Sequence, residues 1–219
     1  MNINRELVSL GFEPEEVKYK KVEELFFDDR FDQINNISRW NGMLRLKEET
    51  VAHHSFIVTW FARVLSEEIF NHPVPKLTTT TFALFHDFDE IFTGDIIHPV
   101  KYNSFNGAEM RKLLNTYNKF VVDNEFPKHV SKSNNLMNVM LNDEVPLFVK
   151  AVVKLCDWLS MKFYLLKEIK LGNHNVFKEY KYCSENIEKA VETAVFELSL
   201  QKDYDVNLSI FECFQTHID

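Results

Sequence analysis

Residues that reverse the chain are scarce in this sequence. Its 219 residues include 5 glycines and 6 prolines. Sandwiches and barrels need many tight turns, and glycine and proline supply most of them. The scarcity favours helices joined by short loops, so we expect an all-α fold. The length suits one domain with its own core, and 45% hydrophobic and 26% charged residues are usual for a globular protein.

Apolar periodicity and helix-ending residues divide the chain into segments. Residues 48–70 contain no glycine or proline, and their apolar residues recur at helical spacing. We expect that helix to end before Pro73, and Gly94 and Gly172 to end two later ones. The expected helices span residues 48–70, 76–92, 107–124, 147–171 and 175–201, with a short helix near residue 211. Residues 1–30 are expected to form an N-terminal helical arm, and residues 31–219 the main domain.

Charge, cysteine spacing and the N-terminus exclude several classes of protein. A formal net charge of −8 repels a polyanion, so we expect no binding to nucleic acid polymers. Cys156, Cys183 and Cys213 form no C-x-x-C pair, which favours reduced core thiols over disulfides or a thiolate zinc site. The longest charge-free apolar stretch, residues 51–62, is too short to span a membrane, and no signal sequence precedes it. We therefore expect a cytoplasmic protein with no membrane contact.

Titratable residues gather within a phenylalanine-rich segment. The run F-A-L-F-H-D-F-D-E-I-F-T-G-D contains His86, Asp87, Asp89, Glu90 and Asp95. A buried carboxylate is costly unless it is paired or bound to a metal. If the segment is one helix, His86, Asp87 and Glu90 project to one side and can serve one site. The alternative is a helix with one solvated face, which would turn Asp87 and Glu90 outward.

Two other apolar segments carry residues that suit a metal site. His53 and His54 lie in V-A-H-H-S, and Asp157 lies in L-C-D-W-L. One His-Asp pair cannot complete the coordination of a divalent ion, so further ligands must come from elsewhere in the chain. Each residue also has an ordinary interpretation, as a hydrogen-bonded core histidine or an aspartate that faces water. Three such segments together favour a shared metal site.

The order and spacing of these motifs resemble one known family, the YfbR-like 5'-deoxynucleotidases of the HD-domain phosphohydrolase superfamily. The similar segments are S-R-W at 38–40, V-A-H-H-S at 51–55, H-D-F-D-E at 86–90, T-G-D-I-I-H-P-V-K at 93–101 and K-L-C-D-W-L at 154–159. The resemblance runs from near Arg39 to near Phe177 and includes Gly172-Asn173. The bare H…HD…D pattern belongs to all HD phosphohydrolases, whereas T-G-D-x-x-x-P-V-K and the Arg-Trp pair are more specific. The resemblance implies an HD-domain helical bundle over residues 31–219, with residues 1–30 as an additional arm.

The resemblance also implies a role for individual residues. The implied metal ligands are His54, His86, Asp87 and Asp157. The implied catalytic residues are Glu90, Asp95 and Arg39. The implied substrate-binding residues are Arg39, Trp40, Asp87, Asp95, Ile96, Ile97, His98 and Asp157, of which Arg39 orients the phosphate and Trp40 packs against the sugar.

Two residues depart from the family's pattern. His53 stands where the family usually has a glutamate. Because the apolar periodicity does not separate His53 from His54, only the family register selects His54 as the ligand. His98 is bulky and titratable at a position that is usually small or hydroxylic, which bears on the fit to the sugar or phosphate.

This resemblance implies a metal-dependent phosphohydrolase that converts a deoxynucleoside 5'-monophosphate (dNMP) and water into deoxynucleoside and phosphate. A divalent ion neutralises the phosphoryl oxygens and lowers the pKa of bound water, Glu90 shuttles a proton, and Arg39 pairs with the phosphate. The mixed nitrogen and oxygen ligand set suits manganese or cobalt first, and then iron or zinc.

Two alternatives remain at this point. One is a dNTP triphosphohydrolase of the same fold, for which Arg45, Lys47 and Lys101 are the available additional cations near the motifs. The other is a catalytically inactive HD-fold protein that binds nucleotide. Related proteins are dimers, and 20 phenylalanines exceed what a small core needs, so we also expect a homodimer.

Overall fold

Helices make up the named elements of the part of the chain that the structure describes. The structure is a computed structural model that describes residues 32–88, 90–96, 108–110, 112–114, 116–117 and 145–216. The named elements are α4 (Val51–Ile69), α5 (Pro73–Phe85), α6 (Glu90–Thr93), α10 (Leu147–Lys170), the 3₁₀ turn η2 (His174–Val176), α11 (Phe177–Ser199), the 3₁₀ turn η3 (Ser209–Phe211) and α12 (Glu212–Thr216). The described residues contain no strand beyond two isolated β-bridges, Ser38 with Thr50 and Phe70 with Val206. The expected all-α fold is confirmed.

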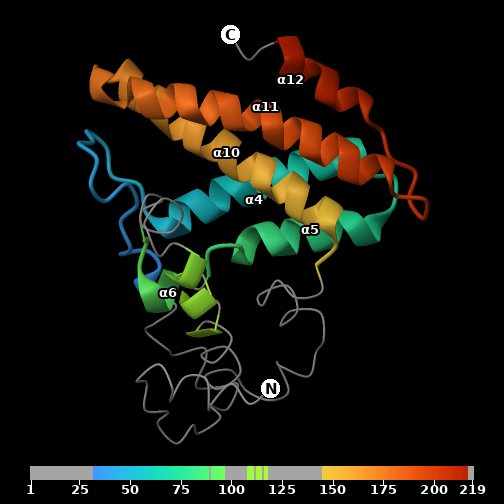
Figure 1. The fold of residues 1–219 in the computed structure, drawn as a ribbon, viewed down its shortest axis with the longest axis horizontal. Coiled ribbons are helices and arrows are strands. Elements are labelled where there is room, and N and C mark those ends of the chain that lie inside the picture. Colours follow the sequence, from blue (N-terminus) through green and yellow to red (C-terminus); the bar gives the residue numbers. More distant parts are fainter. Residues whose placement is uncertain are drawn as a thin grey trace, which may run out of the picture.

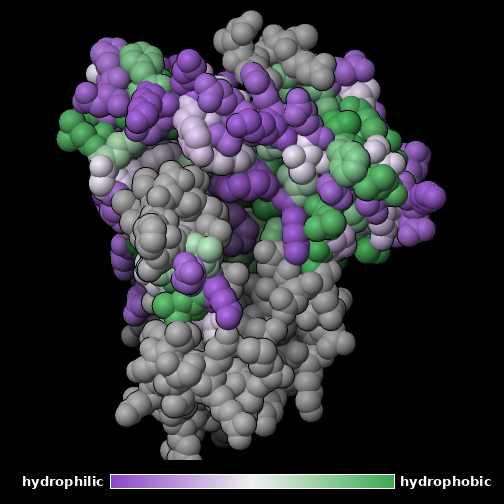
Figure 2. Space-filling model, in the orientation of Figure 1, coloured by the Kyte–Doolittle hydropathy of each residue, from purple (hydrophilic) through white to green (hydrophobic). Residues whose placement is uncertain are grey.

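The helix α10 is the centre of the packing. It contacts α11, α4 and α5, and Figure 1 shows it between α11 and the α4–α5 pair. Buried side chains lie all around it, from Phe148 and Val149 to Leu165, as expected of a helix enclosed by other helices. The helix α11 is amphipathic instead, with a buried stripe that includes Ile187 and Ala194. Its outward positions are largely hydrophilic in Figure 2.

Local capping sets the starts of the first two long helices. The Thr50 hydroxyl accepts a hydrogen bond from the His53 backbone N–H at 3.2 Å, so α4 begins at Val51. Pro73 occupies the first turn of α5, where its missing N–H costs nothing. The helix expected from residue 76 therefore begins earlier, at the proline itself.

The prediction of one continuous helix over residues 76–92 is wrong beyond Phe85. The helix α5 ends at Phe85, residues 86–88 form a turn, and α6 begins at Glu90. The His86 ring nitrogen Nδ1 lies 2.7 Å from the Ala83 carbonyl oxygen, and the Phe88 N–H bonds to the Phe85 carbonyl one residue closer than in an α-helix. The side-chain contact and the tightened turn end the helix, so the carboxylates beyond Phe85 do not share one helical face.

The other expected segments have mixed outcomes. The helix over residues 147–171 is confirmed as α10. The helix expected over 175–201 is α11 (Phe177–Ser199), preceded by η2 (His174–Val176). The described residues 108–110, 112–114 and 116–117 are helical, in agreement with the expected helix at 107–124. The N-terminal arm lies outside the described residues, so the boundary at residue 30 remains a prediction.

The three cysteines are free, as expected, but they do not share one environment. Cys156 and Cys183 are buried. Cys213 lies on the short helix α12 and is exposed. The prediction of a core thiol is therefore wrong for Cys213. Among the described helices, none combines the length and apolarity that crossing a membrane requires.

Candidate metal centre and active site

His54 points inward from α4 to the centre of the site. Its side chain has no exposed surface, and its ring nitrogen Nδ1 lies 3.2 Å from the Ser160 hydroxyl on α10. The opposite nitrogen, Nε2, lies 3.1 Å from Asp157 Oδ1 and 3.6 Å from Asp87 Oδ2. His53 is 48% exposed and lies beside Glu49 instead. The structure thus separates the two adjacent histidines that the sequence periodicity left equivalent.

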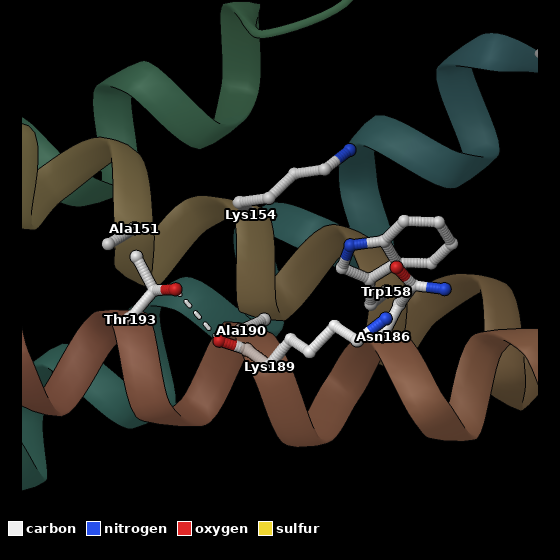
Figure 3. A pocket seen from close by; sticks show the side chains of 7 residues that line it. All are labelled: Ala151, Lys154, Trp158, Asn186, Lys189, Ala190 and Thr193. Atoms are coloured by element: carbon white, nitrogen blue, oxygen red, sulfur yellow. Dashed lines mark hydrogen bonds between the residues drawn. The ribbon is translucent and has the colours of Figure 1, made fainter. Parts of the chain in front are cut away.

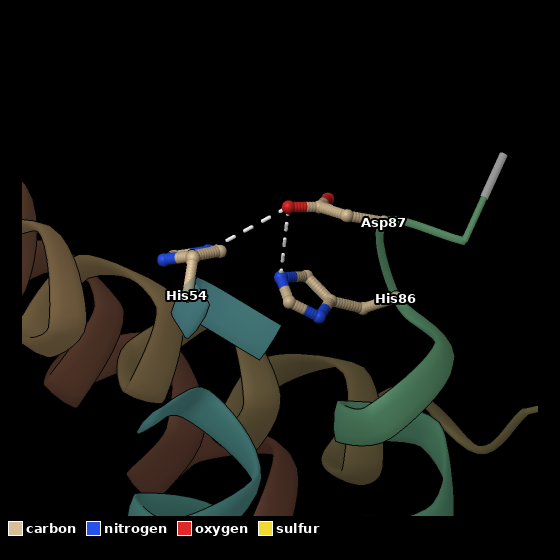
Figure 4. A group of neighbouring side chains, drawn as sticks. All are labelled: His54, His86 and Asp87. Atoms are coloured by element: carbon tan, nitrogen blue, oxygen red, sulfur yellow. Dashed lines mark ion pairs between the residues drawn. The ribbon is translucent and has the colours of Figure 1, made fainter. Parts of the chain in front are cut away.

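His86 and Asp87 face His54 from the turn after α5 (Figure 4). The His86 Nε2 atom lies 3.2 Å from Asp87 Oδ2, and the two imidazole rings have centroids 5.3 Å apart. One donor atom from each of the three side chains lies within 4.8 Å of the other two. Such a group of two imidazoles and one carboxylate has the composition of a divalent-metal site.

Asp157 adjoins this group from α10. Its Oδ1 faces His54 Nε2, while Oδ2 accepts a hydrogen bond from the Lys154 ammonium at 2.6 Å. Asp157 is buried, and its pKa is held low because Lys154 and His54 outweigh the effect of burial, which would raise it. The carboxylate is therefore ionised and has one oxygen directed toward the histidine cluster.

The two histidines leave a buried nitrogen each that suits a cation. Among the described residues, His54 Nε2 and His86 Nε2 make no hydrogen bond. Both Nδ1 atoms are occupied, by Ser160 Oγ and by the Ala83 carbonyl oxygen. This is how metal-binding histidines are usually oriented, with one nitrogen fixed by a partner and the other available to the ion. The side chains of His54, His86, Asp87 and Asp157 therefore fit a divalent metal.

The charges around the two histidines differ, so their pKa values move apart. Burial, together with the Arg39 charge, lowers the pKa of His54 to about 4. Burial acts in the same direction on His86, but the neighbouring Asp87 carboxylate outweighs it and raises the pKa of His86 to about 9. The His86 charge also holds the pKa of Asp87 far below its usual range against burial. The cluster thus concentrates negative charge around His54 and His86, which favours a cation at this position.

Arg39 is buried at the edge of this cluster. Its Nη1 donates a hydrogen bond to Asp87 Oδ2 at 2.9 Å, and Nε lies 3.8 Å from Glu49 Oε2. Burial would lower its pKa, but Asp87, Asp157, Glu90 and Glu49 together raise it. Arg39 is therefore a buried cation near four carboxylates, which come from three segments of the chain: residue 49, residues 87–90 and residue 157.

Trp40 lies beside Arg39 and is held on two sides. Its indole N–H donates a hydrogen bond to Glu49 Oε2 at 2.8 Å. Its ring stacks on Tyr164, with centroids 5.2 Å apart and 10° between the planes. Trp158, next to Asp157, is buried and meets Tyr182 edge to face, as a packing residue would.

Glu90 is buried at the start of α6, with 3% of its surface exposed. The alternative of a solvated face is therefore wrong for Glu90, and Asp87, with 22% of its side chain exposed, is also turned inward. Asp95 and Ile96 are half-buried after α6. Four further residues named from the sequence lie outside the described residues: Asp89, Ile97, His98 and Lys101.

Sequence reasoning missed three residues that hold the Arg39–Trp40 segment or the backbone at Leu46 and Lys47. Glu49 and Glu168 are buried carboxylates, and Tyr164 is the stacking partner of Trp40. Glu168 accepts hydrogen bonds from the backbone N–H groups of Leu46 and Lys47, each at 2.7 Å. The only signal for Glu168 was its position before Gly172-Asn173, and for Glu49 its position next to the α4 cap.

A shallow groove between α10 and α11 is separate from the cluster (Figure 3). Its lining residues are Ala151, Lys154, Trp158, Asn186, Lys189, Ala190 and Thr193. The Thr193 hydroxyl donates to the Lys189 carbonyl of its own helix. Lys154 reaches away from the groove to Asp157, so it belongs to the surroundings of the histidine cluster.

The fold and the donor set define the class of protein. An HD-domain phosphohydrolase from Listeria innocua superimposes with a TM-score of 0.63 at 23% identity, over 90% of this chain and 97% of that one. A cyanophage S-2L HD phosphohydrolase, solved with dA and one catalytic Zn²⁺ ion, gives a TM-score of 0.61 at 16% identity, over 92% of this chain and 96% of that one. At these identities the likeness shows the fold, which is that of the HD-domain phosphohydrolases.

Sequence comparison then identifies the family. The sequence profile of the YfbR-like 5'-deoxynucleotidases matches residues 26–201. A 5'-deoxynucleotidase from Shewanella oneidensis is 31% identical over 144 residues, which cover 63% of this chain and 71% of that protein. This chain belongs to the YfbR-like 5'-deoxynucleotidase family and is a hydrolase, as the sequence motifs implied.

Proposed function

We propose that this protein removes the 5'-phosphate from dNMPs with the help of a divalent metal. The observation that carries the proposal is the buried Arg39 guanidinium beside the His54, His86 and Asp87 cluster. A metal-binding group next to one planar cation suits a single terminal phosphate. Family membership supports a deoxynucleotide as the substrate.

The proposed metal ligands are His54, His86, Asp87 and Asp157. When bound, the ion supplies charge neutralisation for the phosphoryl oxygens and lowers the pKa of a bound water. The mixed nitrogen and oxygen donors suit manganese or cobalt, and iron or zinc after them. The Zn²⁺ ion in the cyanophage neighbour supports a divalent metal in this fold.

Arg39 is the proposed phosphate-binding residue. In the structure its Nη1 pairs with Asp87 Oδ2, the same carboxylate that is a proposed metal ligand. Neutralisation of Asp87 by a cation would weaken this pair and leave the guanidinium edge available to a phosphate. Trp40, adjacent in the chain and fixed against Tyr164, would then pack against the sugar.

Glu90 is the proposed proton shuttle. Hydrolysis forms a bond from a water oxygen to phosphorus and breaks the bond from phosphorus to the 5'-oxygen, which must receive a proton. Glu90 is buried at the start of α6, and its charge contributes to the raised pKa of Arg39, which supports a place for it near the proposed phosphate-binding residue. We assign Asp95, Ile96, Ile97 and His98 to the substrate pocket, with Asp95 as a further catalytic residue.

The supply of cations favours a monophosphate over a triphosphate. Arg45, one of the additional cations named from the sequence, donates hydrogen bonds to the Arg39 carbonyl and to Ser38 Oγ. Lys154 is bound to Asp157. A triphosphate carries about two more negative charges than a monophosphate and would compete for cations that already have partners.

The experiment that tests this proposal measures inorganic phosphate and triphosphate as separate products. The purified protein is supplied with manganese or cobalt and with dNMPs, NMPs or dNTPs of all four bases. We expect phosphate from dNMPs and much slower release from NMPs and dNTPs. Intact triphosphate from dNTPs with no attack on dNMPs would replace this function with a triphosphohydrolase, and no product from any nucleotide would indicate an inactive nucleotide-binding protein.

We also propose that the protein is a homodimer. Phe56, Trp60 and Val64 recur every four residues along α4 and are 63%, 59% and 47% exposed. A stripe of large apolar side chains at this spacing suits a helix-to-helix contact. Sedimentation at micromolar concentration tests the proposal, and a monomer would contradict it. The cytoplasmic location expected from the sequence stays a prediction.

A further inference from the structure

Glu49 is a buried carboxylate that the proposed chemistry does not use. Only 2% of its surface is exposed, and it lies immediately before the Thr50 cap of α4. A buried glutamate is costly unless other groups satisfy it, so its contacts indicate what it holds in place. Those contacts go to Arg39, Trp40 and His53.

One oxygen of Glu49 serves both Arg39 and Trp40. Oε2 accepts the hydrogen bond of the Trp40 indole at 2.8 Å and lies 3.8 Å from Arg39 Nε. The backbone joins the same segments, because the Arg39 N–H donates to the Glu49 carbonyl at 2.8 Å. The guanidinium and the indole are therefore fixed relative to each other through a single carboxylate.

The backbone of Trp40 makes this fixation necessary. Trp40 has a φ of +63°, in the left-handed region that bulky residues rarely adopt. Such a conformation persists only where surrounding contacts determine it. The carboxylate at the indole edge and Tyr164 on the indole face supply those contacts.

The two ends of the Arg39 guanidinium also have different partners. Nη1 pairs with Asp87, a proposed metal ligand, whereas Nε faces Glu49. A cation held by Asp87 would weaken the first contact, while the second contact does not involve a proposed metal ligand. Glu49 thus keeps Arg39 oriented while the Nη1 edge turns to the substrate.

We propose that Glu49 is a positioning residue that aligns Arg39 and Trp40 and thereby sets the affinity for the phosphate and sugar of the substrate. This inference rests on the proposed function. Glu49 acts through its two neighbours and takes no part in the chemical step. Its loss should therefore raise KM and change kcat little.

The kinetic test compares two adjacent glutamates. Glu49→Gln removes the charge at nearly constant size, and Glu48→Gln makes the same change at a side chain that is 67% exposed. We expect KM for a dNMP to rise about tenfold in Glu49→Gln, with kcat within about threefold of wild type and with unchanged metal content. Glu48→Gln should keep the wild-type KM. Equal KM values in both variants and wild type would overturn the inference.

A second readout does not depend on activity. The chain has three tryptophans, so its indole N–H groups give three resonances in a nitrogen–proton spectrum, and Trp40→Phe identifies one of them. Glu49→Gln should shift the Trp40 resonance and speed its exchange with water, and should leave those of Trp60 and Trp158 in place. An unchanged Trp40 resonance would refute the contact in solution.

The two readouts separate failure of the inference from failure of the proposed function. If wild type hydrolyses dNMPs and Glu49→Gln has a normal KM, only the inference is wrong. If wild type releases no phosphate from any dNMP, the proposed function is wrong, and so is the claim that Glu49 sets dNMP affinity, even where the indole resonance moves. A moved resonance together with a raised KM supports both.

Discussion

Glu168→Gln is expected to destabilise the protein strongly, although Glu168 lies outside the candidate active site. Its two carboxylate oxygens accept three hydrogen bonds at 2.7 Å, from Leu46 N, Lys47 N and the Asn173 side chain. Glutamine has one acceptor oxygen and an NH₂ group, so at least one of these buried donors loses its partner and meets another donor.

The magnitude follows from the number of bonds affected. One buried donor without a partner lowers the free energy of unfolding by about 1–3 kcal/mol. The hydrogen bonds that remain are weaker because their acceptor no longer carries a charge. We expect a total loss of about 3 kcal/mol in the free energy of unfolding. For a chain of this size, that loss lowers Tm by about 6–12 °C.

Thermal unfolding followed by circular dichroism measures this effect. Glu188→Gln is the matched control, because it makes the same change at an exposed position on α11 and should alter stability by less than about 0.5 kcal/mol. If both variants melt within a degree or so of each other, the carboxylate does not satisfy these donors in solution and the reasoning is refuted.

The same carboxylate predicts a pH dependence of stability. Burial by itself would raise the pKa of Glu168, but the hydrogen bonds from Asn173, Leu46 and Lys47 outweigh it and hold the pKa below its usual value. Because the folded-state pKa is below the unfolded one, the stabilisation is complete above about pH 4.3 and is lost as the pH falls through the folded-state pKa. The stability difference between wild type and Glu168→Gln should therefore shrink in acid, and a difference that grows in acid would contradict the assignment.

Three further predictions concern the site and the thiols. Glu90→Gln should retain its metal and fold but lose about 10²- to 10⁴-fold in kcat, and normal turnover would exclude Glu90 as the proton shuttle. Ser160→Ala should weaken metal binding about 10- to 100-fold in a metal titration, since the Ser160 hydroxyl contacts the His54 Nδ1 atom, and unchanged affinity would contradict that role. In the native protein a thiol reagent should label the exposed Cys213 first. Burial raises the pKa of Cys156 and raises that of Cys183 to about 12, so both thiols react slowly. Equal labelling of all three cysteines would contradict the burial of Cys156 and Cys183.

Sequence patterns predicted the long helices because those helices depend on local signals. The central helix α10 ends next to Gly172, which adopts a φ of +95°, and α4 begins directly after Thr50. The break after Phe85 was not predictable in the same way. It depends on a contact between the His86 ring and the Ala83 carbonyl that apolar periodicity does not encode.

The candidate site was predicted where a motif carried it and missed where only tertiary packing did. The choice of His54 over His53 came from the family register, and in the structure His54 is the histidine that faces the cluster. Glu49 and Glu168 carried no comparable signal, because a glutamate in a charged stretch usually faces water. Both glutamates accept hydrogen bonds from backbone or indole N–H groups that reach them only in the folded chain. A local sequence pattern does not reveal such donors.

The metal content of adjacent-histidine variants tests the central claim most directly. Wild type, His53→Ala, His54→Ala and Asp157→Asn are each equilibrated with manganese, desalted and analysed for bound ion. We expect about one ion per chain in wild type and in His53→Ala, and little or none in His54→Ala and Asp157→Asn, because His54 Nε2 and Asp157 Oδ1 lie at the cluster while His53 faces Glu49. A site emptied by His53→Ala and retained by His54→Ala, or a wild-type protein that binds no divalent ion, would contradict it.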